Sequence, residues 1–437
     1  MDGPYHPDLY ATDRDVESWW AASAPPAPPR PALEGDARAD VAIIGAGYAG
    51  LACARALAEA GVEVVLLDAG AVGWGASGRA GGIVGLGGDR LGAEALLARF
   101  GEAETAAYVG AQVDEIERLR AFCAEQGVET QGEAEAFVAL TRRAWRRLRA
   151  KRGRFGVEVE PLPRDAFAER GFDSPRQQGA LMARPSFGVH PLALARALAA
   201  EAERAGARVL ERSCVLAWRR EGAEHRLETA AASLRARRVV LAANGFTPDG
   251  LHPAFRGRAM PVISMIGVTR PLTAEERGGF RLADPFATDR RLLYYARMLP
   301  QGRLLFGMRG DLSGAEADAP RLRRRLRAHM DWMFPQWRDV ALEFFWRGPV
   351  CMTRAQRPAV GRLEDDAGVF HAFAWHGSGV AAASAGGRLL AGLMLGANRA
   401  IPAPFAGLPP RIPLPGLRRL QLRAALTLYR GLDALDG

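Results

Sequence analysis

The sequence is poor in lysine and cysteine. Lys151 is the only lysine among 58 lysine and arginine residues, so the net charge of +9 comes almost wholly from arginine. The four cysteines, Cys53, Cys123, Cys214 and Cys351, stand far apart and form no CxxC pair. This spacing excludes a disulfide framework and a zinc site and favours a reducing compartment. We therefore expect a cytoplasmic protein without a metal.

Long apolar runs are also absent. The segment from Met1 to Arg14 is acidic and polar and has no apolar signal-peptide core. No window reaches the run of about 18 apolar residues that a spanning helix needs, so we expect neither a secreted nor a transmembrane protein. With 437 residues, 49% hydrophobic and 24% charged, the chain has a globular composition and exceeds what one core usually organises. Two domains are expected.

Two arginine-rich runs, 142–152 and 321–327, raise the alternative of a nucleic acid or an anionic membrane as partner. Both runs carry leucine, tryptophan or alanine at helical spacing, which is typical of a solvated helix face. We therefore expect no nucleic-acid partner and a small molecule as the main ligand.

Strand and helix patterns alternate in separated parts of the chain. They run from Val41 to about Arg99 and again from Val189 to Val215, whereas Pro261 to Met308 reads as strands without crossover helices. This indicates a two-domain α/β (α+β) fold, in which an antiparallel-sheet substrate domain is inserted into a discontinuous Rossmann-like domain. The expected boundaries are an arm at 1–38, the nucleotide domain at 39–100, 185–250 and 345–400, the substrate domain at 101–184 and 251–344, and a tail at 401–437.

A dinucleotide fingerprint follows the first apolar strand. Val41 to Ile44 lead into GAGYAG at 45–50, a helix closed by Gly61, and a second strand that ends at Asp68. The three glycines of this motif allow a tight turn, a close approach of the pyrophosphate and close packing of helix on strand, and the helix N-terminus supplies free N–H groups. An acid at position 68 would hold ribose hydroxyls and disfavours a 2′-phosphate, which leaves NAD or FAD.

The stretch from Gly70 to Gly88 holds nine glycines and cannot form regular structure. Its GASGRAGG, at 75–82, resembles the GASGRNGG of the D-amino-acid oxidase-like (DAO) family of FAD-dependent oxidoreductases, and most of all the γ-glutamylputrescine oxidase-type amine oxidoreductases. Further similarity lies in SWWAAS at 18–23, VVLAANGFT at 239–247, WRGPVCMTRAQRPAVG at 346–361 and FAWHGSGV at 373–380. Ala80 stands where relatives have asparagine, which leaves the substrate open.

The resemblance implies bound FAD and a set of residues around it. In that family the first fingerprint binds the ADP half, the GASGR segment lines the flavin, and a late glycine turn meets the far edge of the ring. The implied positions are Gly45, Ala46, Gly47, Tyr48, Ala49, Gly50, Asp68, Ala69, Gly75, Ala76, Ser77, Arg79, Gly81, Gly82, Ile83, Val215, Ala243, Asn244, Trp346, Gly377, Ser378, Gly379 and Val380.

Oxidation of an amine by a flavin depends on orientation and on exclusion of water, so we expect no obligatory catalytic acid or base. The substrate-facing candidates are Met265, Tyr295, Arg297, Arg309, Trp375 and His376. Strand alternation allows only one of Tyr294 and Tyr295 to face the site. An arginine on the face of Tyr295 could clamp a carboxylate or form a surface ion pair, and the histidine could contact the ligand or be structural.

Cys351 lies near the position where some relatives attach flavin covalently, but the spacing to the next threonine differs, so we expect non-covalent FAD. In the tail, Leu417, Leu420, Ala424, Leu428 and Leu435 form one helical stripe, which we expect to dock onto the protein, with a membrane-surface helix as the alternative.

The expected reaction is oxidation of an amine or amino acid to an imine by hydride transfer to flavin N5. Water then hydrolyses the imine to a carbonyl compound, and O2 or another acceptor reoxidises the flavin. Two alternatives stay open: a dehydrogenase that passes electrons to a quinone or protein, and a flavoprotein that modifies RNA.

Overall fold

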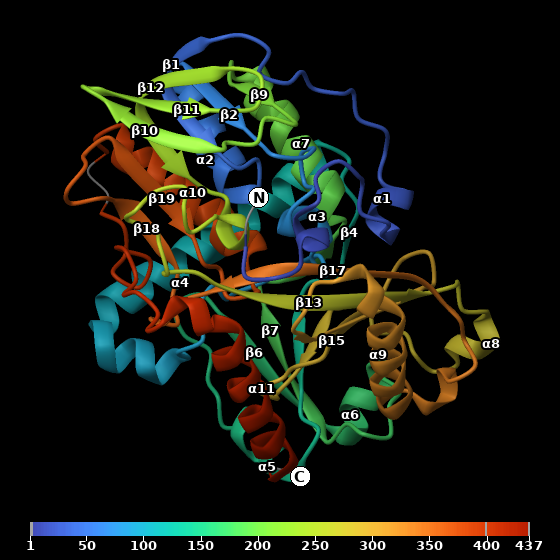
Figure 1. Ribbon diagram of the computed structural model, residues 1–437. Helices are drawn as coiled ribbons and strands as arrows, with labels where there is room; N and C mark the ends of the chain where they lie inside the picture. Colours follow the sequence, from blue (N-terminus) through green and yellow to red (C-terminus); the bar gives the residue numbers. More distant parts are fainter. Residues whose placement is uncertain (1–2, 398–399, 436–437) are drawn as a thin grey trace.

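Two eight-stranded sheets, connected by chain that crosses between them several times, organise the protein (Figure 1). The computed structural model describes residues 3–397 and 400–435. In the first sheet the apolar strand β1 (Ala37–Ile44) pairs in parallel with β2 (Val64–Leu67) and β12 (Ser233–Leu241). Two more parallel strands extend this core, β9 (Arg208–Leu210) beside β2 and β19 (Val369–Phe373) beside β12. The Rossmann-like α/β domain is therefore discontinuous in sequence, as expected.

Antiparallel strands complete the first sheet, and helices cover it. The added strands are β10 (Ala217–Glu221), β11 (Glu224–Glu228) and β18 (Ala359–Arg362). The helices that share its buried core are α2 (Tyr48–Glu59), α4 (Ala93–Glu125), α7 (Pro191–Arg204) and α10 (Val380–Met394).

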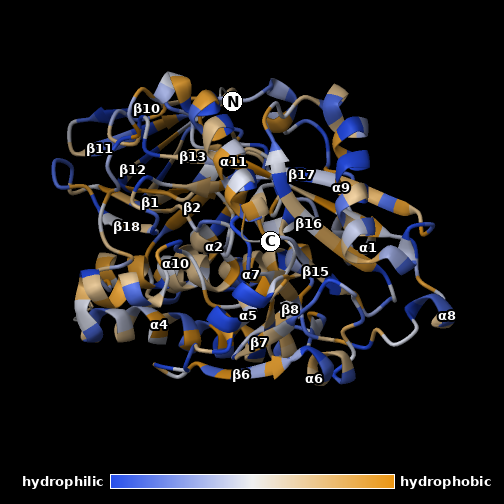
Figure 2. Ribbon diagram, turned by 90° about the horizontal axis from the view of Figure 1, so that it is seen from below, coloured by the Kyte–Doolittle hydropathy of each residue, from blue (hydrophilic) through white to orange (hydrophobic). Residues whose placement is uncertain are grey.

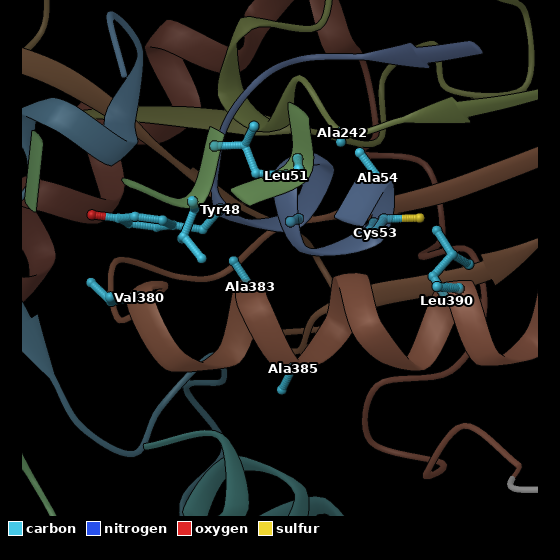
Figure 3. Packing of buried hydrophobic residues seen from close by; sticks show 14 of the residues in the cluster. Tyr48, Leu51, Cys53, Ala54, Ala242, Val380, Ala383, Ala385 and Leu390 are labelled. Carbon is cyan, nitrogen blue, oxygen red and sulfur yellow. The ribbon is translucent and has the colours of Figure 1, made fainter. Parts of the chain in front are cut away.

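Small residues let α2 and α10 approach closely. Figure 3 shows Tyr48 of α2 near Val380 and Ala383 of α10. A Cβ at Gly387 would lie 2.2 Å from the carbonyl oxygen of Ala49. The first turn of α2 therefore packs against the middle of α10.

The second sheet has the order β17-β13-β16-β15-β14-β5-β7-β6 and is antiparallel except where β14 runs parallel to β5. Its last strand by sequence, β17, continues to Met352, past the boundary expected at residue 345, because it pairs along its length with β13. The strands are β5 (Glu135–Val138), β6 (Glu158–Pro163), β7 (Gly179–Arg184), β13 (Met260–Thr269), β14 (Phe286–Thr288), β15 (Tyr295–Met298), β16 (Leu304–Asp311) and β17 (Leu342–Met352).

One face of this sheet is covered by α9 (Ala319–Met333), whose Leu322, Leu326 and Met330 are buried in an aromatic-rich core. The arginines of this helix lie between those buried positions. The arginine-rich run at 321–327 is therefore part of an amphipathic helix, which carries both hydrophilic (blue) and hydrophobic (orange) residues in Figure 2. The remaining short elements are α3 (Ala76–Arg79), α5 (Arg142–Leu148), α6 (Arg164–Glu169), α8 (Ala274–Arg277), and the small sheet of β3 (Ile83–Val84), β4 (Thr130–Gln131) and β8 (Phe187–Val189).

The N-terminal arm lies against the body and carries the short helix α1 (Trp19–Ser23). Trp20 of this helix is 1% exposed. The arm is therefore an integral part of the fold rather than a loose extension.

The tail helix α11 (Arg418–Leu435) docks onto the protein by the face opposite to the expected one. Leu422 and Leu426 are buried beside Tyr10 and Ile263, whereas Leu417, Leu420, Leu428 and Leu435 are exposed. Two polar contacts select this face: Arg418 pairs with Asp249, and the carboxylate of Asp433 accepts the N–H groups of residues 291 and 292.

No helix in the described part of the chain is both long and apolar enough to cross a membrane. The same residues contain no cluster of His, Cys, Asp and Glu suited to a metal, and all four cysteines are free thiols.

Candidate active site

One cavity of about 410 Å³ lies between the two sheets, and three separated stretches of sequence line it. The first stretch begins at the end of β1, the second is the glycine-rich segment after β2, and the third is the turn between β19 and α10. The antiparallel sheet closes the cavity with residues of β5, β13, β14, β15, β16 and β17.

The first end of the cavity is formed by the glycine turn between β1 and α2. Gly45 has φ +110°, and a Cβ there would lie 2.9 Å from the backbone of Ala242. A Cβ at Gly50 would lie 2.0 Å from the carbonyl oxygen of Gly45, so this glycine packs under the turn and does not line the cavity. Gly47 is the N-cap residue of α2 and borders the cavity. The first N–H groups of a helix have no intrahelical partner, so this end suits an anion.

Asp68 follows β2 and faces the same end of the cavity. Its Oδ2 accepts a hydrogen bond from the N–H of Ala46 at 2.6 Å, and its Oδ1 accepts one from the N–H of Gly70 at 2.9 Å. Burial raises the pKa of this carboxyl to about 6. Each carboxylate oxygen can accept a second donor, which leaves room for hydroxyl groups of a ribose.

Two tryptophans fix the glycine-rich loop from outside. Trp346 on β17 donates its indole N–H to the carbonyl of Arg79 at 2.9 Å, and Trp20 on the arm donates to the carbonyl of Ala80 at 2.9 Å. The guanidinium of Arg79 donates to the carbonyl of Trp74 at 2.7 Å and lies 4.2 Å from the centroid of its ring. Burial lowers the pKa of this arginine to about 9. The loop is thus held rigid although nine of its residues are glycines.

The third stretch presents the N-terminus of α10 to the cavity. Gly377 has φ +92°, and Gly379 is the N-cap residue. The turn is braced by Asn244, whose Oδ1 accepts the N–H of Ala374 at 2.8 Å. A Cβ at Gly87 would lie 2.2 Å from the Cβ of Ser378, so this turn and the glycine-rich loop touch. The helix end carries a partial positive charge that favours negative charge placed against it.

The sheet contributes Tyr295 and Arg309 to the cavity. The Tyr295 hydroxyl lies 2.9 Å from Ser264 Oγ, and burial raises the pKa of this tyrosine to about 12. A Cβ at Gly81 would lie 2.8 Å from its ring, so the tyrosine packs directly on the glycine-rich loop. Arg309 donates to the carbonyl of His376 at 3.2 Å. Tyr294 faces the other side of the sheet and bonds to His329, as strand alternation requires.

Most of the expected ligand-contacting residues line this cavity, and four do not. Besides Gly50, these are Met265, Arg297 and His376. Met265 lies between the cavity residues Ser264 and Ile266 on β13, so its side chain points to the opposite face of the sheet, into the core under α9.

Arg297 and His376 point away from the cavity for different reasons. Arg297 shares the face of Tyr295, but its guanidinium donates to the carbonyl of Val189 at 2.7 Å and lies 5.2 Å from the Trp20 ring. The Nε2 atom of His376 lies 3.2 Å from the carbonyl oxygen of Arg357, and burial lowers the pKa of this histidine to about 4. Both residues therefore brace the walls.

The sequence did not point to several polar or aromatic residues that line the cavity, among them Trp74, Asp89, Arg90, Glu135, Phe137, Ser213, Phe246 and Ser264. Glu135 and Phe137 alternate along β5. The parallel pairing of β5 with β14 brings them to the cavity, and no local signal predicts that pairing.

The lining fits a flavin adenine dinucleotide. One continuous cavity joins a dinucleotide-binding turn and its ribose-binding acid to a glycine-walled region with a second helix N-terminus. Three acidic side chains line the cavity, Asp68, Asp89 and Glu135, and of these Asp68 bonds to the dinucleotide-binding turn.

Comparison with known proteins agrees with this geometry. Residues 40–393 match the family described as FAD dependent oxidoreductase (DAO). The chain is 31% identical to the probable oxidoreductase OrdL of Rhizobium meliloti over 390 residues, 87% of this chain and 88% of the relative. It is 30% identical to γ-glutamylputrescine oxidoreductase of Escherichia coli over 417 residues, 93% and 95% of the two chains. Among solved structures, glycine oxidase from Geobacillus kaustophilus has a similar fold, with TM-score 0.68 and 22% identity over 86% of this chain and 100% of that one.

Proposed function

This chain belongs to the family of FAD-dependent oxidoreductases, and we propose that it oxidises a carbon–nitrogen bond of an amine or amino acid to an imine, which water hydrolyses to a carbonyl compound. One observation carries the proposal: the dinucleotide-binding turn, the glycine-rich loop, the N-terminus of α10 and the face of the antiparallel sheet all border the same cavity. The relative from Escherichia coli is named for a substrate of this class.

When bound, FAD supplies the acceptor for the hydride that leaves the substrate carbon. The contribution of the chain is to orient the substrate and to exclude water. Ile266 and Tyr295 give the sheet side of the cavity apolar surface, and the tyrosine is fixed by Ser264. Trp375 adds apolar surface from the turn before α10. The positive end of α10 stabilises negative charge that develops on a group bound against Gly379 and Val380. Neither contribution needs a dedicated acid or base.

We propose that the flavin is bound without a covalent link. Cys351 borders the cavity, but it is 1% exposed and burial raises the pKa of its thiol to about 12. A thiol attacks as the thiolate, so this cysteine is a poor nucleophile near neutral pH. Acid precipitation of the purified protein should release all flavin into the supernatant, and yellow colour that stays with the pellet would contradict this proposal.

The experiment that tests the reaction is anaerobic mixing of the purified yellow protein with a panel of polyamines, N-methyl amino acids and D-amino acids. A substrate bleaches the absorbance of oxidised flavin. Admission of air then distinguishes an oxidase, which recovers its colour and forms peroxide, from a dehydrogenase, which recovers it only with an added dye. Failure of every amine and amino acid to bleach the flavin would overturn the proposed reaction.

A further inference from the structure

Glu135, the first residue of β5, is a buried carboxylate that faces the cavity without a partner. The residue is 9% exposed and lines the cavity. Its side chain forms no hydrogen bond or ion pair with any residue in the described ranges, and burial is the only influence on its charge. Its Oε2 lies over Gly85, where a Cβ would come within 2.7 Å of it. The nearby hydroxyl of Ser186 donates elsewhere, to the carbonyl of Val84 at 2.8 Å.

A buried carboxylate without a partner is costly, because desolvation is not offset by a counter-charge. Burial is the single cause that raises the pKa of Glu135, to about 7. The cost disappears when a cation enters the cavity and pairs with the carboxylate. An unpaired acid that faces a ligand cavity therefore indicates a cationic group on the ligand.

The position of Glu135 separates it from the place where Tyr295 meets the glycine-rich loop. Across the sheet, Tyr295 pairs with Ala287 of β14, which pairs with Phe137 of β5, and Glu135 lies two residues before Phe137. Two strand spacings and two residues correspond to about 10 Å across the sheet and about 7 Å along it. The Cα atoms of Glu135 and Tyr295 are therefore roughly 12 Å apart, so the carboxylate and the tyrosine border different parts of the cavity.

Six charged residues line the cavity: Asp68, Arg79, Asp89, Arg90, Glu135 and Arg309. Arg309, on β16, is three strands away from β5 in the sheet order and makes no ion pair within the described chain. Burial and the neighbouring Arg90 lower the pKa of its guanidinium to about 10. A cation near Glu135 is thus not repelled at short range by this arginine.

We propose that Glu135 binds a protonated nitrogen of the substrate other than the nitrogen that is oxidised. The preferred substrate is accordingly an extended amine with a second cationic group, such as a diamine or a longer polyamine. The inference rests on the proposed amine oxidation and specifies its substrate class. The second charge improves binding through Glu135 and leaves the chemical step unchanged.

The test compares cadaverine with pentylamine, which has the same carbon chain but no second ammonium group. Both are given to the FAD-loaded wild-type protein, to Glu135→Gln and to the control Glu133→Gln, which removes an exposed carboxylate two residues away. Charge-assisted hydrogen bonds are worth about 1.5 to 3 kcal/mol, or roughly 10- to 150-fold. We expect a preference of this size for cadaverine in kcat/KM, carried by KM, in the wild type and in the control. In Glu135→Gln the preference should be lost while the rate with pentylamine is kept.

A second readout does not depend on turnover. Cadaverine should raise the melting temperature of the wild type and the control more than pentylamine does, and it should not do so in Glu135→Gln.

If both amines are oxidised equally well and Glu135→Gln changes neither readout, the assignment of Glu135 is wrong while amine oxidation stands. If no amine or amino acid of the panel is oxidised but cadaverine stabilises the wild type and the control and not Glu135→Gln, the cation site stands and the proposed reaction fails. If the Gln variant does not fold, Glu135→Asp, which keeps the charge but withdraws it by one methylene, should show a reduced preference, and an unreduced one overturns the assignment.

Discussion

Trp20 and Trp346 hold consecutive carbonyl groups of the glycine-rich loop, those of Ala80 and Arg79, each at 2.9 Å, and their rings meet edge to face at 6.4 Å. One tryptophan comes from the N-terminal arm and the other from β17 of the antiparallel sheet. The loop that lines the candidate flavin site is therefore clamped between parts of the chain more than three hundred residues apart. The clamp fixes a backbone that its own glycines would leave mobile.

Replacement of Trp20 by Phe should weaken FAD binding. The change removes the hydrogen bond to Ala80 and keeps most of the packing, which is worth about 1 kcal/mol or roughly fivefold in affinity. Titration of FAD into the flavin-free protein, followed by fluorescence, measures it. Trp19→Phe is the matched control because Trp19 packs on Phe344 rather than on the loop. Equal affinities of the two variants would contradict the clamp.

Replacement of Gly47 by Val should abolish retention of the flavin. A Cβ there would lie 3.1 Å from Ser77 Oγ, so the protein can fold, but the branched side chain fills the space that a pyrophosphate needs. The absorbance of the purified variant, compared with its circular dichroism spectrum, measures the effect. Gly110→Val is the control, since no heavy atom lies within 4 Å of a Cβ at that position. A folded Gly47→Val protein with its full flavin content means that the phosphate-binding turn is assigned wrongly.

Replacement of Tyr295 by Phe should leave the protein yellow and slow its reduction by substrate, by about tenfold or less. The variant loses the hydrogen bond to Ser264 that orients the ring, which is worth about 1 kcal/mol. Stopped-flow reduction without oxygen measures the rate. Tyr294→Phe, on the other side of the same strand, loses its bond to His329 and should alter stability but not reduction. The same slowing in both variants would show that Tyr295 acts only through stability.

Stability should depend on pH through Glu135. Its pKa is raised from 4.5 to about 7 in the folded protein, so the unfolded chain releases this proton first as the pH rises. The free energy of unfolding therefore falls between about pH 4.5 and pH 7, by roughly 3 kcal/mol from this group. In thermal melts of the substrate-free, FAD-loaded proteins, Glu135→Gln should melt above the wild type at pH 8 and close to it near pH 4.5. Glu133→Gln should show no such trend, and parallel curves for all three proteins would rule out the unpaired carboxylate.

The parts of the fold and site that depend on local pattern could be predicted from the sequence. The turn at 45–50, the acid at 68 and the turn before α10 follow from glycine spacing next to apolar strands, and most of these residues line one cavity. The side of β15 that carries Tyr295 follows from strand alternation.

Tertiary packing decides the rest, and the sequence does not encode it locally. Arg297 lies on the same face of β15 as Tyr295, as strand alternation requires. Its long side chain nevertheless turns away from the cavity and donates to the carbonyl of Val189. The tail helix has apolar residues on two sides, and the contacts of Arg418 and Asp433 select the face with Leu422. Glu135 reaches the cavity through the pairing of β5 with β14, across about 150 residues of sequence.

The central claim is that the stretches beginning at Val41, Gly70 and Val369 enclose a single flavin. The most direct measurement is the flavin content of the purified chain, read from the absorbance spectrum before and after denaturation. We predict one FAD per chain, released intact on denaturation, with the same content restored when FAD is added to stripped protein. A colourless protein that takes up no added FAD would contradict the claim and the amine chemistry that depends on it.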